Sequence, residues 1–233
     1  MSIPKIILQI WDKGEKEAPA FLLELSQTWK EHHPDWQYIL WDTPQMETFI
    51  NQHTAYRDLY KRYPLNIQRW DMIRYLILYT YGGVYVDFDY ECIDSMEKLL
   101  ENQSCCLALD PEEHARIFKK EQIITNAFMA TEAKHPFFKM LLDYLLQDNL
   151  SQYDSSNQFN YVLETTGPYL LTRMYNQWVL QKEICLLSPS VISPLTKNEI
   201  NRCLNGNMEE KTLSCKLQEA IAIHYFYGSW YER

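Results

Sequence analysis

Short apolar runs alternate with longer helical stripes along the first part of the chain. Residues 5–11 are almost continuously apolar, which predicts a buried strand. Residues 19–31 begin with a proline and place their apolar side chains at helical spacing, which predicts an amphipathic helix. Residues 36–41 predict a second strand, and Thr43-Pro44 is the predicted cap of the next helix. This alternation predicts an α/β fold with a parallel sheet.

The middle of the chain carries the clearest pattern. Residues 66–81 predict a long helix, which the glycine pair after it would end. The run 84–89 (VYVDFD) is short and aliphatic, which predicts a buried central strand. Further strands are predicted at 105–109, 125–130 and 220–224, and further helices at 136–146 and 151–164. Residues 184–213 follow no regular period, because prolines interrupt them, and are expected to be irregular before the last strand.

Length and charge narrow the class of protein. The chain has 233 residues, which suits a single domain (1–233) that buries its core without disulfides. It contains 22 basic and 31 acidic residues, a net charge of −9, which argues against nucleic acid as a partner. An acidic surface also repels an anionic nucleotide, so a phosphate ligand would need a metal ion or a few placed cations.

The cysteines and the hydropathy pattern indicate the cellular compartment in which the protein is expected. The six cysteines form no C-x-x-C pair, so neither a zinc ribbon nor a redox motif is expected. The N-terminus shows no charged leader with an apolar core, and no apolar run reaches about 20 residues. We therefore expect free thiols and a cytoplasmic location.

Asp87 and Asp89 are the strongest chemical signal in the chain. Side chains two apart on a strand share a face, so the two carboxylates would repel each other unless a cation lies beside them. Oxygen ligands favour hard cations, and ligands of α/β sheets collect beyond the carboxyl ends of strands. We therefore expect Mn²⁺ or Mg²⁺ here. The alternative is a solvated acidic turn, in which a bare D-x-D also occurs.

Asp71 and Arg74 lie three residues apart on the predicted helix 66–81 and therefore share a face. By themselves they would suit a local ion pair of little energetic weight. Because the helix leads directly into the D-x-D strand, the pair is also placed to face the same cleft.

Residues 69–91 (RWDMIRYLILYTYGGVYVDFDYE) resemble the D-x-D sugar-binding region of glycosyltransferase family 32, which includes yeast-type initiating mannosyltransferases and many bacterial polysaccharide transferases. They are also similar to the catalytic domain of glucosylating bacterial toxins. Four further parts of the chain match other segments of the family in the same order: 3–11, 126–130, 165–168 and 224–230. The resemblance spans nearly the whole chain and implies an α/β fold of the GT-A nucleotide-sugar transferase type with a Rossmann-like mixed sheet. One departure is Leu8, where the family usually has a histidine, a change that bears on donor preference more than on the reaction.

The resemblance implies roles for the polar positions around the D-x-D. Asp71 and Arg74 would hold hydroxyls of the donor sugar, with Arg74 also near phosphate. Asp87 would contact the ribose and sugar hydroxyls, and Asp89 would bind the metal ion directly. Asn126 would lie near the sugar or the acceptor.

The resemblance also implies roles for residues at the two ends of the chain. Trp11 would stack on the nucleotide base, and Tyr85 would line the nucleotide side of the pocket. His224 matches a position that can bind the metal ion, although a core histidine with no such role is the alternative. Ser229 and Trp230 would reach the β-phosphate from a C-terminal segment, 224–233, that closes over the donor.

The reaction implied is a metal-dependent transfer of a hexose with retention of anomeric configuration. The donor favoured is UDP-glucose or UDP-galactose over GDP-mannose, and no residue stands out as a nucleophile. The acceptor implied is a saccharide or a lipid-linked or protein-linked glycan of bacterial surface polysaccharide or glycoprotein glycan synthesis, with residues 151–211 on its side of the site. A lipid-linked acceptor would bring the protein to the inner membrane face, although no basic amphipathic anchor is visible. The oligomeric state stays open.

Two other functions remain open. An aspartyl-phosphate phosphatase also has D-x-D after an apolar strand, but near the start of its chain and with Thr or Val where this sequence has Glu91. A non-catalytic nucleotide-sugar or glycan-binding module would keep the donor pocket without turnover. Metal-dependent donor binding without transfer or hydrolysis would identify such a module.

Overall fold

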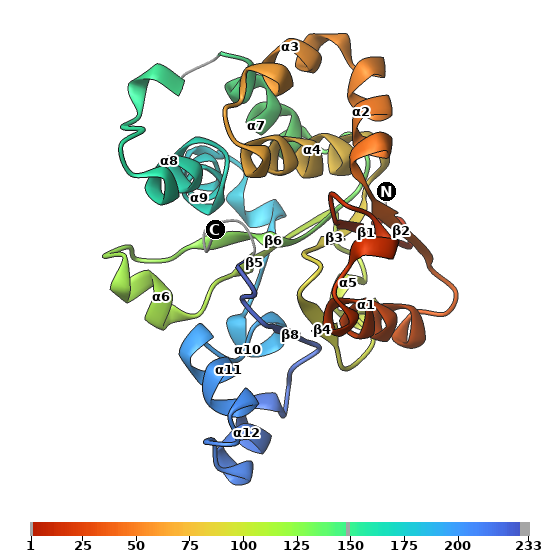
Figure 1. Ribbon diagram of the computed structural model, residues 1–233, viewed down its shortest axis with the longest axis vertical. Coiled ribbons are helices and arrows are strands. Elements are labelled where there is room, and N and C mark those ends of the chain that lie inside the picture. Colours follow the sequence, from red (N-terminus) through yellow and green to blue (C-terminus); the bar gives the residue numbers. More distant parts are fainter. Residues whose placement is uncertain (1, 148–149, 229–233) are drawn as a thin grey trace.

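A six-stranded mixed sheet runs through the middle of the molecule, and helices cover both of its faces (Figure 1). The computed structural model describes residues 2–147 and 150–228. The strand order is β2-β1-β3-β6-β5-β7, and a separate two-stranded sheet pairs β4 with β8. The strands are β1 (Ile6–Ile10), β2 (Gln37–Trp41), β3 (Gly83–Val86), β4 (Tyr90–Cys92), β5 (Cys105–Leu109), β6 (Ile124–Thr131), β7 (Cys185–Leu187) and β8 (Ala222–His224).

The helices form one layer on each side of the sheet. Helices α4, α7 and α9 pack on one face, and α1, α5 and α10 on the other, with α11 and α12 beyond them (Figure 1). The helices are α1 (Ala20–His32), α2 (Thr43–Gln52), α3 (Thr54–Arg62), α4 (Asn66–Tyr81), α5 (Glu97–Leu100), α6 (Glu112–Ile117), α7 (Pro136–Leu146), α8 (Gln158–Thr165), α9 (Pro168–Gln177), α10 (Pro189–Ile192), α11 (Lys197–Leu204) and α12 (Glu210–Leu217), with 3₁₀ turns η1 (Glu15–Glu17), η2 (Leu150–Gln152) and η3 (Gln181–Glu183). None of the helices in the described ranges is long and apolar enough to cross a membrane.

Both faces of the sheet are apolar, which explains why its strands are continuously hydrophobic. Along β1, Ile7 faces the core beneath α1 and Leu8 faces the core beneath α4, and both are almost fully buried. Along β3, Val84 and Tyr85 divide in the same way between the two faces. Successive side chains on a strand point to opposite faces, so a one-residue slip in register would exchange the two cores. The sheet is therefore a rigid scaffold for the side chains at the ends of its strands.

The sequence predicts most of these elements, and the mixed fold of the GT-A type is confirmed. The parallel sheet is wrong in part, because β6 runs antiparallel to both β3 and β5. The reason is that α6 is too short to serve as a crossover, so β5 and β6 form a hairpin around it. The free thiols are confirmed, since none of the six cysteines is in a disulfide.

Three local predictions are also corrected. The cap of α2 is Asp42 rather than Thr43-Pro44, because the Asp42 carboxylate accepts a hydrogen bond from the Gln45 N–H at 2.9 Å. The predicted helix 151–164 begins only at Gln158, and the Asn157 side chain caps it by accepting a hydrogen bond from the Asn160 N–H. The stretch 184–213 is not irregular: it contains β7, α10, α11 and the start of α12. Pro189 starts α10 and Pro194 precedes α11, so the prolines that interrupt the period lie at the beginnings of short helices.

Candidate active site

The D-x-D segment lies in a turn and not on a strand, which corrects the expectation that β3 continues to Asp89. Strand β3 ends at Val86, and the chain turns before β4, with the Tyr90 N–H donating to the Asp87 carbonyl at 3.2 Å. The reason is Phe88, whose side chain turns away from the sheet into an apolar cluster with Leu22 and Leu25 of α1. The two aspartates therefore meet because Phe88 anchors the turn between them.

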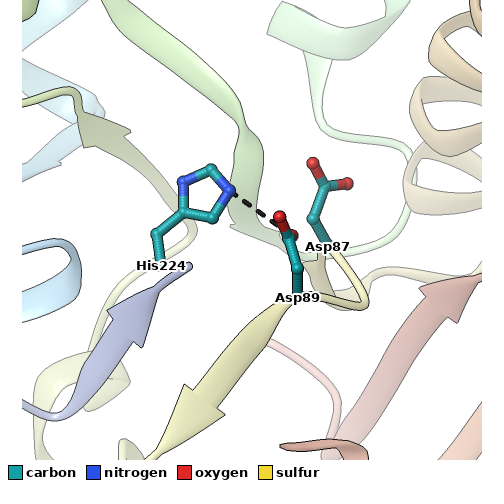
Figure 2. A group of neighbouring side chains, drawn as sticks. All are labelled: Asp87, Asp89 and His224. Atoms are coloured by element: carbon teal, nitrogen blue, oxygen red, sulfur yellow. Dashed lines mark ion pairs between the residues drawn. The ribbon is translucent and has the colours of Figure 1, made fainter. Parts of the chain in front are cut away.

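Strand pairing adds His224 to the two aspartates. Strand β8 pairs antiparallel with β4 and places His224 opposite Tyr90, one residue beyond the turn. Figure 2 shows the imidazole pointing toward the Asp89 carboxylate, with Nε2 3.4 Å from Oδ1. One ligand atom from each of Asp87, Asp89 and His224 lies within 4.8 Å of the others. His224 is more than 130 positions from the two aspartates in the sequence, and the small sheet brings it to them.

The His224 ring is fixed on both faces. It stacks on the Tyr90 ring at a centroid distance of 4.2 Å and contacts the Phe226 ring at 4.0 Å. Its Nδ1 is buried and makes no hydrogen bond within the described part of the chain. The orientation of the imidazole toward Asp89 therefore comes from aromatic packing.

Charge couples the members of this cluster. Burial raises the pKa of Asp87, the Arg74 guanidinium opposes that rise and the neighbouring Asp89 carboxylate adds to it. Burial would also raise the pKa of Asp89, but His224 and the backbone N–H of Tyr227, which donates at 2.8 Å, outweigh it and the pKa falls. For His224, burial is outweighed by the Asp89 carboxylate, so its pKa is raised. The site thus favours a carboxylate at Asp89 in contact with a positive charge.

Arg74 lies between the D-x-D turn and the protein interior. One guanidinium nitrogen donates to the Asp87 carboxylate at 3.0 Å and to the Asn126 carbonyl at 3.1 Å. The other lies 3.2 Å from the Asp71 carboxylate, one turn earlier on α4. The guanidinium also lies over the Tyr85 ring, and the Tyr85 hydroxyl donates to Asp87 at 2.6 Å. The cation is therefore held in one orientation by the protein itself.

Asp71 and Asn126 lie beneath Arg74 and are not among the residues that line the cleft. Asp71 is 2% exposed, and it accepts from the Asn126 amide at 2.9 Å and from the Thr166 hydroxyl at 2.8 Å. Burial raises the pKa of Asp71 to about 6, against the lowering effect of the Arg74 guanidinium. Tyr75 completes the network, since its hydroxyl accepts from Asn126 and donates to the Thr166 carbonyl. In this structure Asp71 and Asn126 orient Arg74 and do not face the ligand space.

An open cleft of about 190 Å³ extends from the cluster. Trp11, at the end of β1, forms one wall, and its ring packs on Phe88 at 5.6 Å. Ile67 and Trp70 of α4 form another wall together with Arg74. The sequence did not predict a role for either residue, although their spacing of seven and four positions from Arg74 places all three on one helix face. That spacing was the signal that could have found them.

Both ends of the chain contribute to the cleft. Phe226, Tyr227 and Gly228 line it on the side of β8. Ser229 and Trp230, which the family resemblance places at the β-phosphate, lie outside the described residues. Leu8 is fully buried in the core beneath α4 and does not line the cleft.

The cluster fits a divalent cation. Two carboxylates supply the hard oxygen ligands that manganese and magnesium prefer, and the imidazole adds a nitrogen ligand of the kind that transition metals accept. Both hydrogen bonds to Asp87 reach Oδ1, so Oδ2 makes none within the described chain and remains able to bind a metal ion. Asp71 and Asp87 contact the Arg74 guanidinium, and Asp89 adds a third carboxylate beside Asp87, so a cation would offset the excess of negative charge.

Comparison with known proteins agrees with this geometry. Residues 19–106 match the family described as the glycosyltransferase sugar-binding region containing the DXD motif. Inositol phosphoceramide mannosyltransferase 3 of Schizosaccharomyces pombe is 31% identical over 180 residues, which are 76% of this chain and 46% of that protein. An uncharacterised glycosyltransferase of Acanthamoeba polyphaga mimivirus is 28% identical over 98% of this chain and 84% of its own length. The chain spans about half the length of the yeast relatives it matches.

Two solved structures share the fold. The PaToxG glycosyltransferase superposes with a TM-score of 0.55 at 16% identity, over 93% of this chain and 79% of the other. The ligand-free glycosyltransferase domain of the YGT toxin gives a TM-score of 0.55 at 11% identity, over 80% of both chains. Fold and site together define a glycosyltransferase of the GT-A class. The resemblance of the D-x-D segment to glycosyltransferase family 32 is confirmed, because the matched residues 19–106 contain this segment.

Proposed function

We propose that this chain transfers a hexose from a nucleotide sugar to a saccharide or glycoconjugate acceptor, with a divalent cation at Asp87, Asp89 and His224. The observation that carries the proposal is the position of this cluster at one end of a cleft whose walls include Trp11 and Arg74. An aromatic wall suits a nucleotide base, and a fixed guanidinium suits phosphate or sugar oxygens. The acidic chain needs such local cations to hold an anionic donor.

The residues of the site support departure of a nucleoside diphosphate. A bound divalent cation would act as a Lewis acid toward the diphosphate as negative charge develops on it. Arg74 would add hydrogen bonds to the same charge without reorganising, because Asp71, Asp87 and the Asn126 carbonyl already fix it. Asp89 is held by Tyr227 and His224 for direct contact with the cation. The resemblance implies retention, and because no residue in the described lining of the cleft stands out as a nucleophile, retention would proceed by attack from the face of the leaving group.

The identity of the donor belongs to the same proposal. The sequence resemblance favours UDP-glucose or UDP-galactose, whereas the names of the yeast relatives specify mannose as the sugar that they transfer. The same names specify an inositol phosphoceramide as the acceptor of those relatives. Manganese or magnesium as the cation, a role in surface glycan synthesis, and a cytoplasmic location with peripheral contact to the inner membrane face are parts of this proposal too.

The test is a calorimetric titration of the whole chain with UDP, GDP, UDP-glucose, UDP-galactose and GDP-mannose, with Mn²⁺ and with chelator. We expect one nucleotide class to bind only with Mn²⁺, and Asp89→Asn to weaken that binding at least about tenfold, or 1.4 kcal/mol. Asp58→Asn is the matched control, because the Asp58 side chain is 76% exposed on α3, away from the cleft.

Each other outcome points elsewhere. Nucleotide binding that ignores both Mn²⁺ and Asp89→Asn would remove the donor site from this cluster. Metal-dependent binding with neither hydrolysis of the donor nor transfer to any glycan would identify a binding module in place of an enzyme. Release of phosphate from an aryl phosphate would favour the phosphatase.

A further inference from the structure

A second and larger cavity lies outside the donor cleft. It has a volume of about 490 Å³ and lies between the loop 119–122, which leads from α6 to β6, and one face of α9. We infer that this groove binds the saccharide part of the acceptor, an inference that rests on the proposed transferase function. It narrows the acceptor side from the region 151–211 to one groove, and it adds the loop 119–122, which no sequence pattern indicated.

The polar lining of the groove suits sugar hydroxyls. Each hydroxyl both donates and accepts hydrogen bonds, so a site for several of them needs both kinds of partner. The groove offers the Glu164 carboxylate as an acceptor, the Arg173 guanidinium as a donor, and the amides of Gln122 and Asn176 as both. All four groups are planar and can bind two neighbouring hydroxyls at once.

An aromatic surface completes this set. Tyr169 lines the groove, and the Phe118 ring meets the Tyr169 ring edge-on at 6.0 Å. The Lys120 ammonium lies 4.4 Å from the centre of the Tyr169 ring. A ring next to planar polar groups provides the apolar contact that the carbon face of a pyranose needs.

The groove is organised before a ligand binds. Arg173 donates to the Glu164 carboxylate at 3.1 Å and to the Tyr153 hydroxyl at 2.8 Å, so neither charged group is free to collapse into the space. Tyr169 is only 8% exposed, and its hydroxyl makes no hydrogen bond within the described chain. Fixed partners reduce the entropy lost on binding.

Two segments connect the groove to the donor site. Gln122 lines the groove, and four residues later Asn126 donates to Asp71 beneath Arg74, a span of roughly 13 Å for extended chain. Glu164 lines the groove, and two residues later the Thr166 hydroxyl donates to Asp71. A saccharide in the groove would therefore lie near the network that positions Arg74.

The charges in the groove favour a neutral sugar over an anion. Three cations (Lys119, Lys120 and Arg173) face two carboxylates (Glu121 and Glu164), which leaves a net charge of only +1. Glu164 already interacts with two of the cations, at 3.1 Å from Arg173 and 3.6 Å from Lys120. A phosphate would have to approach the Glu164 carboxylate, whereas a hydroxyl can donate to it.

The test blocks the groove and leaves the donor cleft intact. Saturation-transfer NMR is recorded with methyl α-mannoside, methyl β-galactoside and lactose on wild type, on Asn176→Trp and on Gln122→Ala. Asn176 is exposed on α9, so tryptophan there fills the groove without disturbing the core. Asn201→Trp, at an exposed position of α11 outside the groove, is the matched control.

We expect at least one saccharide to give a signal that falls at least fivefold in Asn176→Trp and falls in Gln122→Ala, but not in Asn201→Trp. Affinity for nucleotide with Mn²⁺ should stay within twofold in all variants, which shows that they fold. Equal signals in wild type and Asn176→Trp, including none at all, would overturn the inference. So would displacement of the saccharide by inorganic phosphate at equal concentration, which would reveal an anion site. If the wild-type protein does not bind nucleotide in the presence of Mn²⁺, that result counts against the proposed function and not against the saccharide groove.

Discussion

Arg74 shows how single residues make a charged site inside a folded core. Its guanidinium is 5% exposed and meets two carboxylates and a carbonyl, which together compensate for the loss of water. Breaking such a buried pair from one side leaves an unpaired charge, so each partner has a structural as well as a chemical role. The Thr166 hydroxyl and the Tyr75 hydroxyl belong to this support, because they hold Asp71 and Asn126. Thr166 belongs to the family-like segment 165–168, but no local pattern connects it with Asp71, since the two residues lie 95 positions apart.

His33 is a second buried polar residue, whereas the preceding His32 is exposed to solvent. It is 3% exposed at the end of α1, with Nδ1 3.1 Å from the Trp29 carbonyl and Nε2 accepting from the Met96 N–H at 3.0 Å. This pattern requires the neutral ring with its proton on Nδ1. Burial lowers the pKa of His33, the preceding His32 lowers it further, and the Trp29 carbonyl, Glu97 and Asp94 oppose the shift.

We predict that His33 makes the fold sensitive to mild acid. The folded-state pKa lies below the unfolded value near 6.5, so between the two the unfolded chain binds a proton that the native chain does not. The contribution is intact above pH 6.5 and is lost as pH falls through that window. Urea midpoints measured from pH 7.5 to 5 should decrease less steeply in His33→Gln than in wild type. His32→Gln, at the exposed neighbouring position, removes only the smaller effect of the His32 charge and should change the slope much less than His33→Gln does. A wild-type slope in His33→Gln would refute the prediction.

At the scale of elements, the unit α4–β3–β4 carries the site. The bounds of α4 could be predicted to the residue, because an apolar helical run ends at Gly82, whose φ of +69° and ψ of −167° are a combination that essentially only glycine adopts. The end of β3 could not, since VYVDFD keeps its strand pattern through Asp89 and only the packing of Phe88 against α1 turns the chain. In the same way the pairing of β4 with β8 is a long-range contact that places His224, and local periodicity carries no information about it.

Gly83 is the first residue of β3, shortly after the end of α4, and its conformation leads to a prediction about how these elements pack. Its φ is +104°, and a Cβ there would lie 2.7 Å from the Ile6 carbonyl oxygen of β1. Gly83→Ala should therefore destabilise the protein by about 2 to 4 kcal/mol, from the backbone strain and the displacement of β1. Gly206→Ala is the control, because its φ of +68° gives similar strain but nothing lies within 4 Å of its Cβ. It should cost about 1 kcal/mol. Equal shifts in the urea midpoints of the two variants would show that the contact with β1 does not matter.

At the scale of the whole molecule, the cleft draws on segments from both ends of the chain. Trp11 follows β1, Trp70 and Arg74 come from α4, and Phe226 follows β8. The sequence could assign these segments to one site only through the order of the family's motifs, since no local signal connects residue 11 with residue 226. A ligand in the cleft contacts parts that would otherwise separate on unfolding. Donor binding should therefore stabilise the entire domain and not a single loop.

Thermal unfolding tests this coupling. A ligand at 100 times its dissociation constant adds about 2.7 kcal/mol, which for a domain of this size raises Tm by roughly 5 to 10 °C. We expect this rise with the nucleotide and Mn²⁺ together, and much less with either alone, because the Asp87–Asp89–His224 cluster and Arg74 supply opposite charges to one ligand. Chelator should reverse the shift, and Asp89→Asn should abolish it while Asp58→Asn keeps it. Equal rises with nucleotide alone and with nucleotide plus Mn²⁺ would mean that the cation and the donor bind independently, and the cluster could not then be the metal site of the transferase.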